Sequence, residues 1–377
     1  MLEAIFIGSA IMTLYAYIGY PLSLMLFAYF RHKTVKKQPI CPKVSFVITA
    51  HNEEKRIQKK IENTLALDYP RESFQIIVTS DGSTDLTNAI VNGYKEKGVI
   101  LNALGERRGK ERAQKEALKI AKGDIIVFSD VATLLEPQAL KEIVSNFADP
   151  EVGCVSSEDR VVGINGQPST EGIYVRYEMW LRRLESKINS LVGLSGSFFA
   201  ARKEVCQDFS AELQSDFRTV LSCVKLGLRG VSDPRAIGYY HDVLDEKKEF
   251  DRKVRTVLRG LTVFFRHIEF LNPFRYKLFS YQFFCHKLLR WLVPFFLFIA
   301  FLSNALLIWK SNLFLVLFLG QVVFYGAALW GRIKVDGSNG NFLKIPTYFL
   351  MVNASILIAW WRYFKGQRVI MWNPSER

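Results

Sequence analysis

The sequence predicts an α/β domain with a mixed, mainly parallel sheet, flanked by α-helical segments that cross a membrane. Two observations support this. Short β-branched apolar runs alternate with helical stretches between residues 44 and 147, and such alternation is typical of a parallel sheet with helices on both faces. Long apolar stretches occupy residues 4–30 and 291–361 on either side of that domain.

The first apolar stretch is predicted to be an N-terminal transmembrane helix within residues 1–30. Residues 4–30 carry no charge, and about 20 apolar residues suffice to cross a bilayer. A signal peptide would instead have a basic start and an apolar region of about 7–15 residues. The basic linker 31–43 follows, and because positive flanks stay in the cytoplasm, we expect the chain from residue 31 onward to be cytoplasmic.

The last apolar region, 291–361, is expected to form a C-terminal transmembrane region. Residues 291–309 and 313–330 are predicted to form two spans. Residues 345–361 form a shorter third run, which either spans the membrane or is re-entrant. A full span would place the basic tail 362–377 outside, against the positive-inside rule, so both alternatives remain.

Charge and cysteine content limit the kinds of partner. The formal net charge is +14, and basic residues crowd the flanks of the apolar segments, where they favour anionic headgroups. We therefore expect membrane lipids, and not nucleic acid, as partners. The five cysteines are scattered without a C-x-x-C pair, which favours reduced thiols and argues against a zinc site.

The domain over residues 44–249 is predicted from its alternating elements. Helices are expected up to Leu65 and over 86–95, 110–121 and 137–147, the last with Pro137 in its first turn. The predicted strands are residues 44–49, 74–79, 99–102, 124–128 and 152–156.

Beyond residue 156 the alternation stops. Helices are predicted over 173–189 and 217–226, with a small, turn-rich segment at 195–200 that a substrate could approach closely. Residues 250–265 combine an aromatic and aliphatic stripe with arginines on another side. That pattern suits either a helix docked on the protein or, as we expect for the region 250–290, amphipathic basic helices at the membrane interface.

Acidic residues follow two of the predicted strands. Asp81 follows the predicted strand 74–79, and Asp130 follows the predicted strand 124–128. Ligands of open α/β sheets bind at the carboxyl ends of parallel strands. The sequence therefore predicts a nucleotide-binding crevice at this edge of the sheet.

These motifs resemble those of the membrane-bound family 2 glycosyltransferases, which have an A-type nucleotide-sugar-binding fold. The segment from Val47 to Glu54 resembles the opening strand and Asn-Glu turn of that family, and Asp81-Gly82-Ser83 resembles its Asp-Gly-Ser motif. The resemblance implies that Asp81 binds the nucleobase of the donor, with Glu53 nearby.

The resemblance also implies a divalent metal. Asp130 takes the place of the first acid of the family's Asp-x-Asp motif, whereas Ala132 replaces the second. Mg²⁺ or Mn²⁺ is expected at Asp130, because hard cations bind carboxylate and phosphate oxygens. With one carboxylate the ion is held more weakly.

The expected catalytic base is Asp216. Gln214-Ser215-Asp216 lies where the family has an acidic motif, and the resemblance implies that Asp216 deprotonates the acceptor hydroxyl. The alternative is that Ser215 and Asp216 only cap a helix.

Four further residues complete the expected site. Arg255 takes the place of the family's Gln-x-x-Arg-Trp motif and is expected at the donor diphosphate, the alternative being a lipid headgroup. Lys110 is expected at the donor phosphates, the alternative being a solvated loop charge. Ser195 and Gly196 are expected to bind the acceptor.

The resemblance implies an inverting enzyme that moves a sugar from a nucleotide-diphosphate sugar, UDP- or GDP-linked, to a lipid-linked or saccharide acceptor. Its expected place is the cytoplasmic face of the plasma (inner) membrane, in cell-envelope or exopolysaccharide biosynthesis. The alternatives are a processive polysaccharide synthase and a non-catalytic membrane scaffold of the same fold.

Overall fold

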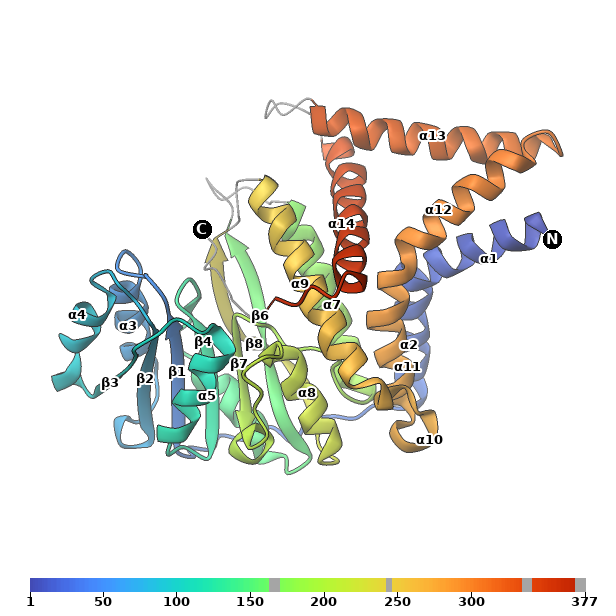
Figure 1. Ribbon diagram of the computed structural model, residues 1–377. Helices are drawn as coiled ribbons and strands as arrows, with labels where there is room; N and C mark the ends of the chain where they lie inside the picture. The colour runs from blue at the N-terminus through green and yellow to red at the C-terminus, as the bar shows by residue number, and fades with distance from the viewer. Residues whose placement is uncertain (163–169, 242–245, 334–340, 370–377) are drawn as a thin grey trace. The chain divides into compact units, whose positions relative to one another are not determined.

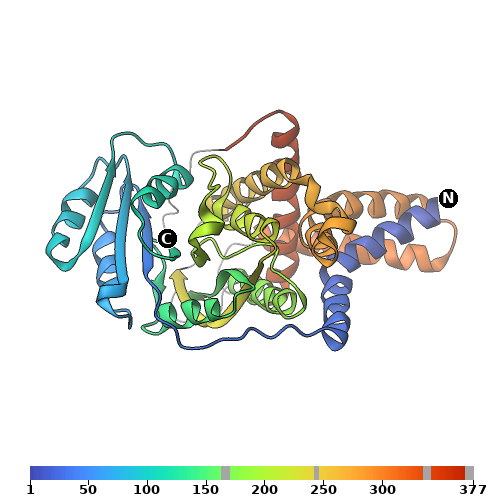
Figure 2. The same cartoon turned by 90° about the horizontal axis from the view of Figure 1, so that it is seen from below.

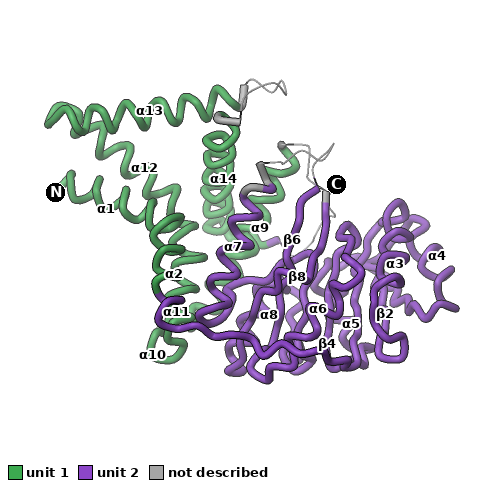
Figure 3. Tube along the Cα trace, turned by 180° about the vertical axis from the view of Figure 1, so that it is seen from behind, with its two compact units in different colours: residues 1–26, 245–368 green, residues 27–244, 369–377 purple. Residues whose placement is uncertain are grey.

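The computed structural model describes residues 1–162, 170–241, 246–333 and 341–369. The chain forms two compact units, coloured separately in Figure 3. Unit 1 comprises residues 1–26 and 245–368, and unit 2 comprises residues 27–244 and 369–377. Each unit is described by itself.

Unit 2 is built on one eight-stranded mixed sheet (Figure 1). The strand order is β3-β2-β1-β4-β7-β6-β8-β5. In chain order the strands are β1 (Val44–Ala50), β2 (Phe74–Asp81), β3 (Val99–Leu104), β4 (Ile125–Asp130), β5 (Leu134–Leu135), β6 (Val152–Val162), β7 (Phe198–Arg202) and β8 (Arg229–His241).

The parallel half of the sheet has β1 at its centre. Val47 of β1 pairs with Ile77 of β2 on one side and Phe128 of β4 on the other. All seven residues of β1 are buried, as expected for a strand of a parallel sheet covered on both faces. The register brings the ends of β1, β2 and β4 together, so Asp81 and Asp130 lie at the same edge.

Helices cover the sheet, as Figures 1 and 2 show. The helix α5 packs on β1 and β2, α6 on β6, β7 and β8, and α7 on β6 and β8. The helices of this unit that follow β1 are α3 (Ile57–Leu65), α4 (Thr87–Asn92), α5 (Lys110–Ile120), α6 (Ala139–Ser145), α7 (Thr170–Ile188) and α8 (Ser215–Lys225). The predicted A-type mixed sheet with helices is confirmed.

Three strands were not predicted, the two-residue β5 and the longer β7 and β8. β7 begins in the second half of the segment 195–200 that was expected to be turn-rich, and it pairs antiparallel with β4 and β6. β8 pairs parallel with β6, but its register breaks between Ser232 and Ile237, in a stretch that contains Pro234. Proline cannot donate to a ladder and is tolerated at such irregularities. β7 follows α7 and β8 follows α8, but β7 is only five residues long and β8 is interrupted by the register break, so neither forms the regular apolar run that identifies a strand in the sequence.

Among the described residues, four helical segments are long and apolar enough to cross a membrane, and they belong to unit 1 except for the last four residues of the first segment. They are Leu2–Phe30, Leu278–Leu307, Asn312–Gly331 and Leu343–Phe364. They comprise α1 (Leu2–Leu14), a π-helical turn at Tyr15–Gly19, α2 (Tyr20–Phe30), α11 (Leu278–Phe283), α12 (Arg290–Leu307), α13 (Asn312–Ile333) and α14 (Asn341–Phe364). The second segment begins at Leu278, earlier than the apolar run predicted from residue 291.

Polar side chains join these segments. The hydroxyls of Tyr15 and Tyr281 lie 2.7 Å apart, which links the first segment to the second. The indole N–H of Trp360 donates to the carbonyl oxygen of Trp291 at 2.9 Å, which links the last segment to the second. Such bonds stabilise helix packing where no water competes for the polar groups.

The helix α9 (Glu246–Arg266) of unit 1 covers the predicted amphipathic stretch. Its apolar stripe is buried, with Val254, Leu258 and Leu261 fully so, and α9 packs along α14. Protein therefore covers this stripe, as in the docked-helix alternative. The predicted position at a membrane interface stays a prediction.

Candidate functional site

The carboxylate of Asp81 holds the loop that leads into α5. It is buried at the end of β2. Its two oxygens accept the backbone N–H groups of Arg108 at 2.9 Å and Gly109 at 2.7 Å. Gly82 has a positive φ, and a Cβ there would lie 2.5 Å from the backbone nitrogen of Arg107. Only glycine fits so close to that loop.

That loop positions Lys110, the first residue of α5. The Lys110 ammonium forms a close ion pair with Asp130 at the end of β4, and it donates to the carbonyl oxygen of Gly196 at 3.1 Å. The Asp130 N–H in turn donates to the carbonyl oxygen of Ser197 at 2.9 Å. Segments far apart in the sequence therefore meet at one point.

Gly196 also borders the carboxylate of Asp216. A Cβ on Gly196 would lie 3.2 Å from Asp216 Oδ2. The same oxygen accepts the side-chain N–H of Gln214 at 3.2 Å. Asp216 lies in the first turn of α8 and is half-buried. In the part of the chain that the structure describes it forms no ion pair, so its carboxylate remains available to accept a proton.

The side chain of Ser195 is engaged by Asp159. It is buried, and its hydroxyl contacts Asp159 Oδ1 at 2.8 Å and Oδ2 at 2.6 Å. The Ser197 hydroxyl donates to Asp159 as well, at 2.8 Å. Asp159 thus anchors the loop 195–197. It escaped sequence analysis because a lone Asp within a strand gives no local signal.

Glu53 lies at the sheet edge as predicted, but its carboxylate is already paired. It accepts from Arg56 Nε at 2.7 Å and Nη2 at 2.9 Å, and its N–H donates to the Thr87 hydroxyl at 2.8 Å. Burial raises the pKa of Glu53, and the Arg56 guanidinium opposes that rise. The buried pair holds the turn after β1.

Lys60 is a second residue that the sequence did not reveal. It lies on α3, is fully buried, and donates to the Ser129 hydroxyl at 2.7 Å and the Thr133 carbonyl oxygen at 2.6 Å. Burial lowers the pKa of Lys60 to about 7, while the negative charge of Asp130 acts in the opposite direction. The helical pattern hides this residue, because its neighbour Lys59 is exposed.

The described residues offer a divalent ion one carboxylate at this place. No group of three or more His, Cys, Asp or Glu side chains with metal-ligand spacing occurs among them. Ala132 supplies no oxygen, and Asp130 is paired with Lys110. Mg²⁺ often uses one or two carboxylates together with substrate phosphates. The site therefore fits such an ion only together with a bound phosphate ligand.

Arg255 belongs to unit 1, apart from the residues whose mutual geometry is described above. Burial and the nearby Arg259 and Arg252 guanidinium groups lower the pKa of Arg255. Like charges gathered on one helix favour an anion beside them.

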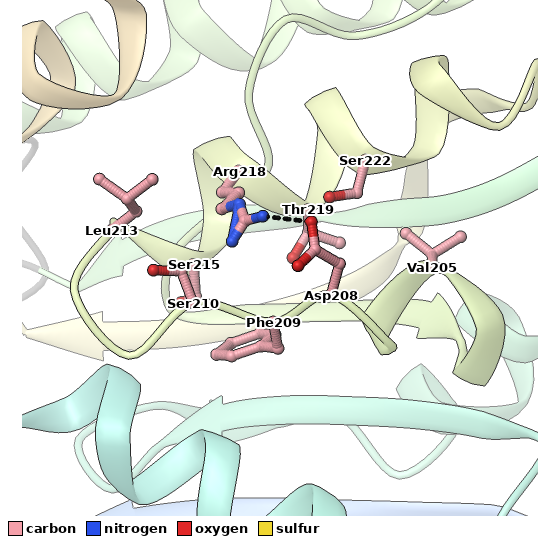
Figure 4. A pocket seen from close by; sticks show the side chains of 9 residues that line it. All are labelled: Val205, Asp208, Phe209, Ser210, Leu213, Ser215, Arg218, Thr219 and Ser222. Atoms are coloured by element: carbon pink, nitrogen blue, oxygen red, sulfur yellow. Dashed lines mark hydrogen bonds and ion pairs between the residues drawn. The ribbon is translucent and has the colours of Figure 1, made fainter. Parts of the chain in front are cut away.

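A small pocket lies along α8 (Figure 4). The Arg218 guanidinium pairs with Asp208 there at 2.7 Å, and the ring of Phe209 stacks on Phe128 with centroids 5.6 Å apart. Asp130 and Asp216 are not among its lining residues. The pocket is thus distinct from the candidate site.

The sheet, the strand-end acids and the carboxylate of α8 together define an A-type glycosyltransferase fold. Residues 45–209 match the family described as "Glycosyl transferase family 2". The chain therefore contains a family 2 glycosyltransferase domain, and the predicted resemblance is confirmed.

Relatives with known names support this assignment. Poly-beta-1,6-N-acetyl-D-glucosamine synthase of Staphylococcus aureus (strain COL) is 32% identical over 120 residues, which are 31% of this chain and 29% of that protein. The probable glycosyltransferase YdaM of Bacillus subtilis (strain 168) is 28% identical over 245 residues, covering 60% of this chain and 58% of that protein. The chain thus matches less than a third of the length of the first relative.

A solved structure resembles nearly the whole chain. It is the mannosyltransferase PcManGT from Pyrobaculum calidifontis in complex with GDP-Man and Mn²⁺. It superposes with a TM-score of 0.77 at 22% sequence identity, over 98% of this chain and all of that one. At this identity the likeness supports the fold alone.

Proposed function

We propose that this chain is an inverting glycosyltransferase that moves a sugar from a nucleoside-diphosphate donor to a lipid-linked or saccharide acceptor. One observation carries the proposal. The backbone of Gly196 lies between the Lys110–Asp130 pair and the carboxylate of Asp216. A cationic group suited to a phosphate and a base suited to a hydroxyl therefore face the same glycine.

The reaction follows from these roles. Asp216 takes the proton of the acceptor hydroxyl, whose oxygen attacks the anomeric carbon of the donor sugar. The bond from that carbon to the diphosphate oxygen breaks, and the diphosphate leaves with the electron pair. Lys110 offsets the charge that develops on it, and Arg255 is proposed for the same role on the resemblance alone. A single displacement inverts the configuration at the anomeric carbon.

The donor is proposed to be UDP- or GDP-linked. Asp81 would accept a hydrogen bond from the nucleobase, since a carboxylate oxygen that accepts one backbone N–H keeps a second lone pair. Glu53 supports the same end of the site through its turn. The Pyrobaculum relative, which was solved with GDP-Man, supports a nucleotide sugar as the donor class.

Mg²⁺ or Mn²⁺ is proposed as the cofactor, with Asp130 as its protein ligand. Such an ion supplies positive charge to phosphate oxygens. The Mn²⁺ in the Pyrobaculum relative supports this choice. Ala132 leaves the ion dependent on the donor phosphates, so we expect weak binding of the metal before the donor arrives.

The proposed location is the cytoplasmic face of the plasma (inner) membrane, in cell-envelope or exopolysaccharide biosynthesis. The four apolar helices support membrane insertion, and the basic linker 31–43 supports the orientation. In this layout the enzymatic domain spans residues 44–249 and the membrane region residues 291–361.

The test uses membranes that contain the full chain. They are incubated with radiolabelled UDP- and GDP-sugars and extracted lipid acceptors, with Mg²⁺ or Mn²⁺. We expect transfer from at least one donor and its loss in Asp216→Asn. The matched control, Asp208→Asn, alters an exposed carboxylate in the segment before α8 and should keep transfer. Equal inactivity of wild type and Asp216→Asn with every donor would favour the scaffold alternative.

A processive polysaccharide synthase is the second candidate. The similarity to the staphylococcal poly-beta-1,6-N-acetyl-D-glucosamine synthase favours it. Product length separates the two candidates. A ladder of long polymers in the same assay would replace the single-transfer proposal, whereas one added sugar per acceptor would support it.

A further inference from the structure

The burial of Lys60 costs free energy. A buried ammonium loses its hydration, and in proteins a paired carboxylate usually offsets that loss. Within the described parts of the chain, Lys60 has no ion pair. Its ammonium is held by two neutral oxygens, Ser129 Oγ and Thr133 O, and it lies 5.5 Å from the ring centroid of Phe46.

The two oxygens mark the ends of one turn. Ser129 precedes Asp130, and Thr133 follows Ala132, so the ammonium of Lys60 spans the stretch that carries the proposed phosphate-binding acid. The Thr133 N–H also donates to the Asp130 carbonyl oxygen at 3.2 Å. Lys60 therefore holds the turn 130–133 in shape from its buried side.

The charges around Asp130 do not balance. Two ammonium groups act on its one carboxylate, Lys110 through an ion pair and Lys60 through its field. Glu53, whose charge interacts with that of Asp130, is paired with Arg56. Asp216 lies on the other side of Gly196, so two ammonium groups act on the one carboxylate of Asp130, and an anion placed beside Asp130 would compensate the second. A fixed charge in a low-dielectric site acts more strongly on such an anion than it would in water.

We infer that Lys60 is a positioning residue for the donor diphosphate: its buried ammonium holds both ends of the Asp130–Thr133 turn and supplies positive charge beneath the phosphates. This inference rests on the proposed function. It assigns a role to a side chain that touches neither the donor nor the acceptor, and it explains why the site keeps a buried charge that costs stability.

The experiment measures binding of UDP and GDP to the full chain in detergent, by calorimetry below pH 7, where Lys60 carries its charge, with Mg²⁺ present and with a chelator. Lys60→Met keeps most of the length of the side chain and removes the charge. We expect its affinity for the nucleoside diphosphate to fall by about tenfold or more, with no drop in melting temperature. Lys59→Met, an exposed lysine of the same helix, is the matched control and should bind as wild type does.

Nucleoside monophosphates distinguish a role of Lys60 at the diphosphate from a general disruption of the nucleotide-binding site. UMP or GMP should bind Lys60→Met and wild type with similar affinity, because the nucleobase end at Asp81 is unaffected. Equal weakening for monophosphate and diphosphate would overturn the inference, as would unchanged diphosphate binding by Lys60→Met.

Ser129→Ala provides a second test of the inference in case Lys60→Met does not fold. It removes one of the two hydrogen bonds of the ammonium and leaves the charge in place. We expect several-fold weaker diphosphate binding at an unchanged melting temperature, and wild-type affinity would overturn the inference. If wild type binds neither UDP nor GDP, the proposed donor class fails as well. If wild type binds the nucleoside diphosphate and Lys60→Met binds it equally well, only the inference about Lys60 fails.

Discussion

The carboxylate of Asp81 accepts the backbone N–H of Gly109 at 2.7 Å, so the end of β2 is tied to the residue that precedes α5. Lys110 is the next residue, and its ammonium pairs with Asp130. The acid expected at the nucleobase thus also determines where the cation at the phosphates lies. One side chain couples the two ends of the proposed donor site.

Asp81→Asn should weaken the link between the nucleobase end and the phosphate end of the proposed donor site. The asparagine side chain has one acceptor oxygen, so one of the two backbone N–H groups of residues 108–109 loses its partner, at a cost of about 1–3 kcal/mol. We expect donor binding to weaken at least about tenfold and the melting temperature to fall modestly. Glu106→Gln, an exposed acid of the same loop, should leave donor affinity unchanged, and similar affinities for the two variants would contradict this coupling.

Gly82→Ala tests the close approach of the loop 105–109. A Cβ at Gly82 would lie 2.5 Å from the backbone of Arg107, whereas at Gly98 a Cβ would meet nothing within 4 Å, although both glycines have positive φ. Gly98→Ala should therefore cost only the backbone strain, about 1 kcal/mol. Gly82→Ala should lower the melting temperature further and reduce transfer. Equal decreases in melting temperature for the two variants would show that a Cβ at residue 82 does not clash with the loop.

Asp159→Asn tests the support of the loop 195–197. Its carboxylate accepts from both Ser195 and Ser197, and hydrogen bonds to a charged group contribute about 1.5–3 kcal/mol each. We expect a loss of transfer of at least about tenfold, because the Gly196 backbone no longer lies firmly beside Asp216. Ser157→Ala removes only a third, longer bond to Asp159, of 3.0 Å, and should keep most activity. Wild-type rates in Asp159→Asn would rule out this support.

Lys60 should make stability depend on pH in the alkaline range. Its pKa is about 7 in the folded chain against 10.5 for an ordinary lysine. Between these values the unfolded chain binds a proton that the folded chain lacks, so stability rises with pH. Below a pH of about 7 the buried ammonium destabilises the folded chain by its full amount, and above pH 10.5 this destabilisation is gone.

Thermal melting of wild type and Lys60→Met across that range measures this dependence. The stability advantage of Lys60→Met should be largest at pH 7 and shrink as pH rises, while Lys59→Met follows wild type throughout. A constant difference between wild type and Lys60→Met would contradict the lowered pKa.

Cys41 offers a test of membrane orientation without an engineered label. It is the exposed cysteine of the chain, and the other four are buried. It lies three residues before the domain that begins at residue 44, so it should be cytoplasmic. A membrane-impermeant maleimide should label it only after cells are permeabilised, and Cys41→Ser should abolish the signal. Labelling in intact cells would reverse the proposed topology.

Most of the parallel half of the fold was readable from sequence. Strand and helix periodicity identified β1 to β4 and their helices, and the apolar runs identified the four candidate spans. β7 and β8 were missed because antiparallel additions and a proline-containing bulge leave no alternating signature. Their positions depend on pairing with strands far away in the chain.

The sequence by itself determined the elements, the strand-end acids Asp81 and Asp130, and the candidate base Asp216, because these depend on local periodicity and on motifs. Only the tertiary structure decided that Gly196 lies between Lys110 and Asp216. It alone revealed the support from Asp159 and Lys60, since neither residue departs from its local pattern. The physical reason is that long-range packing, and not the neighbours along the chain, selects which charges share a buried site.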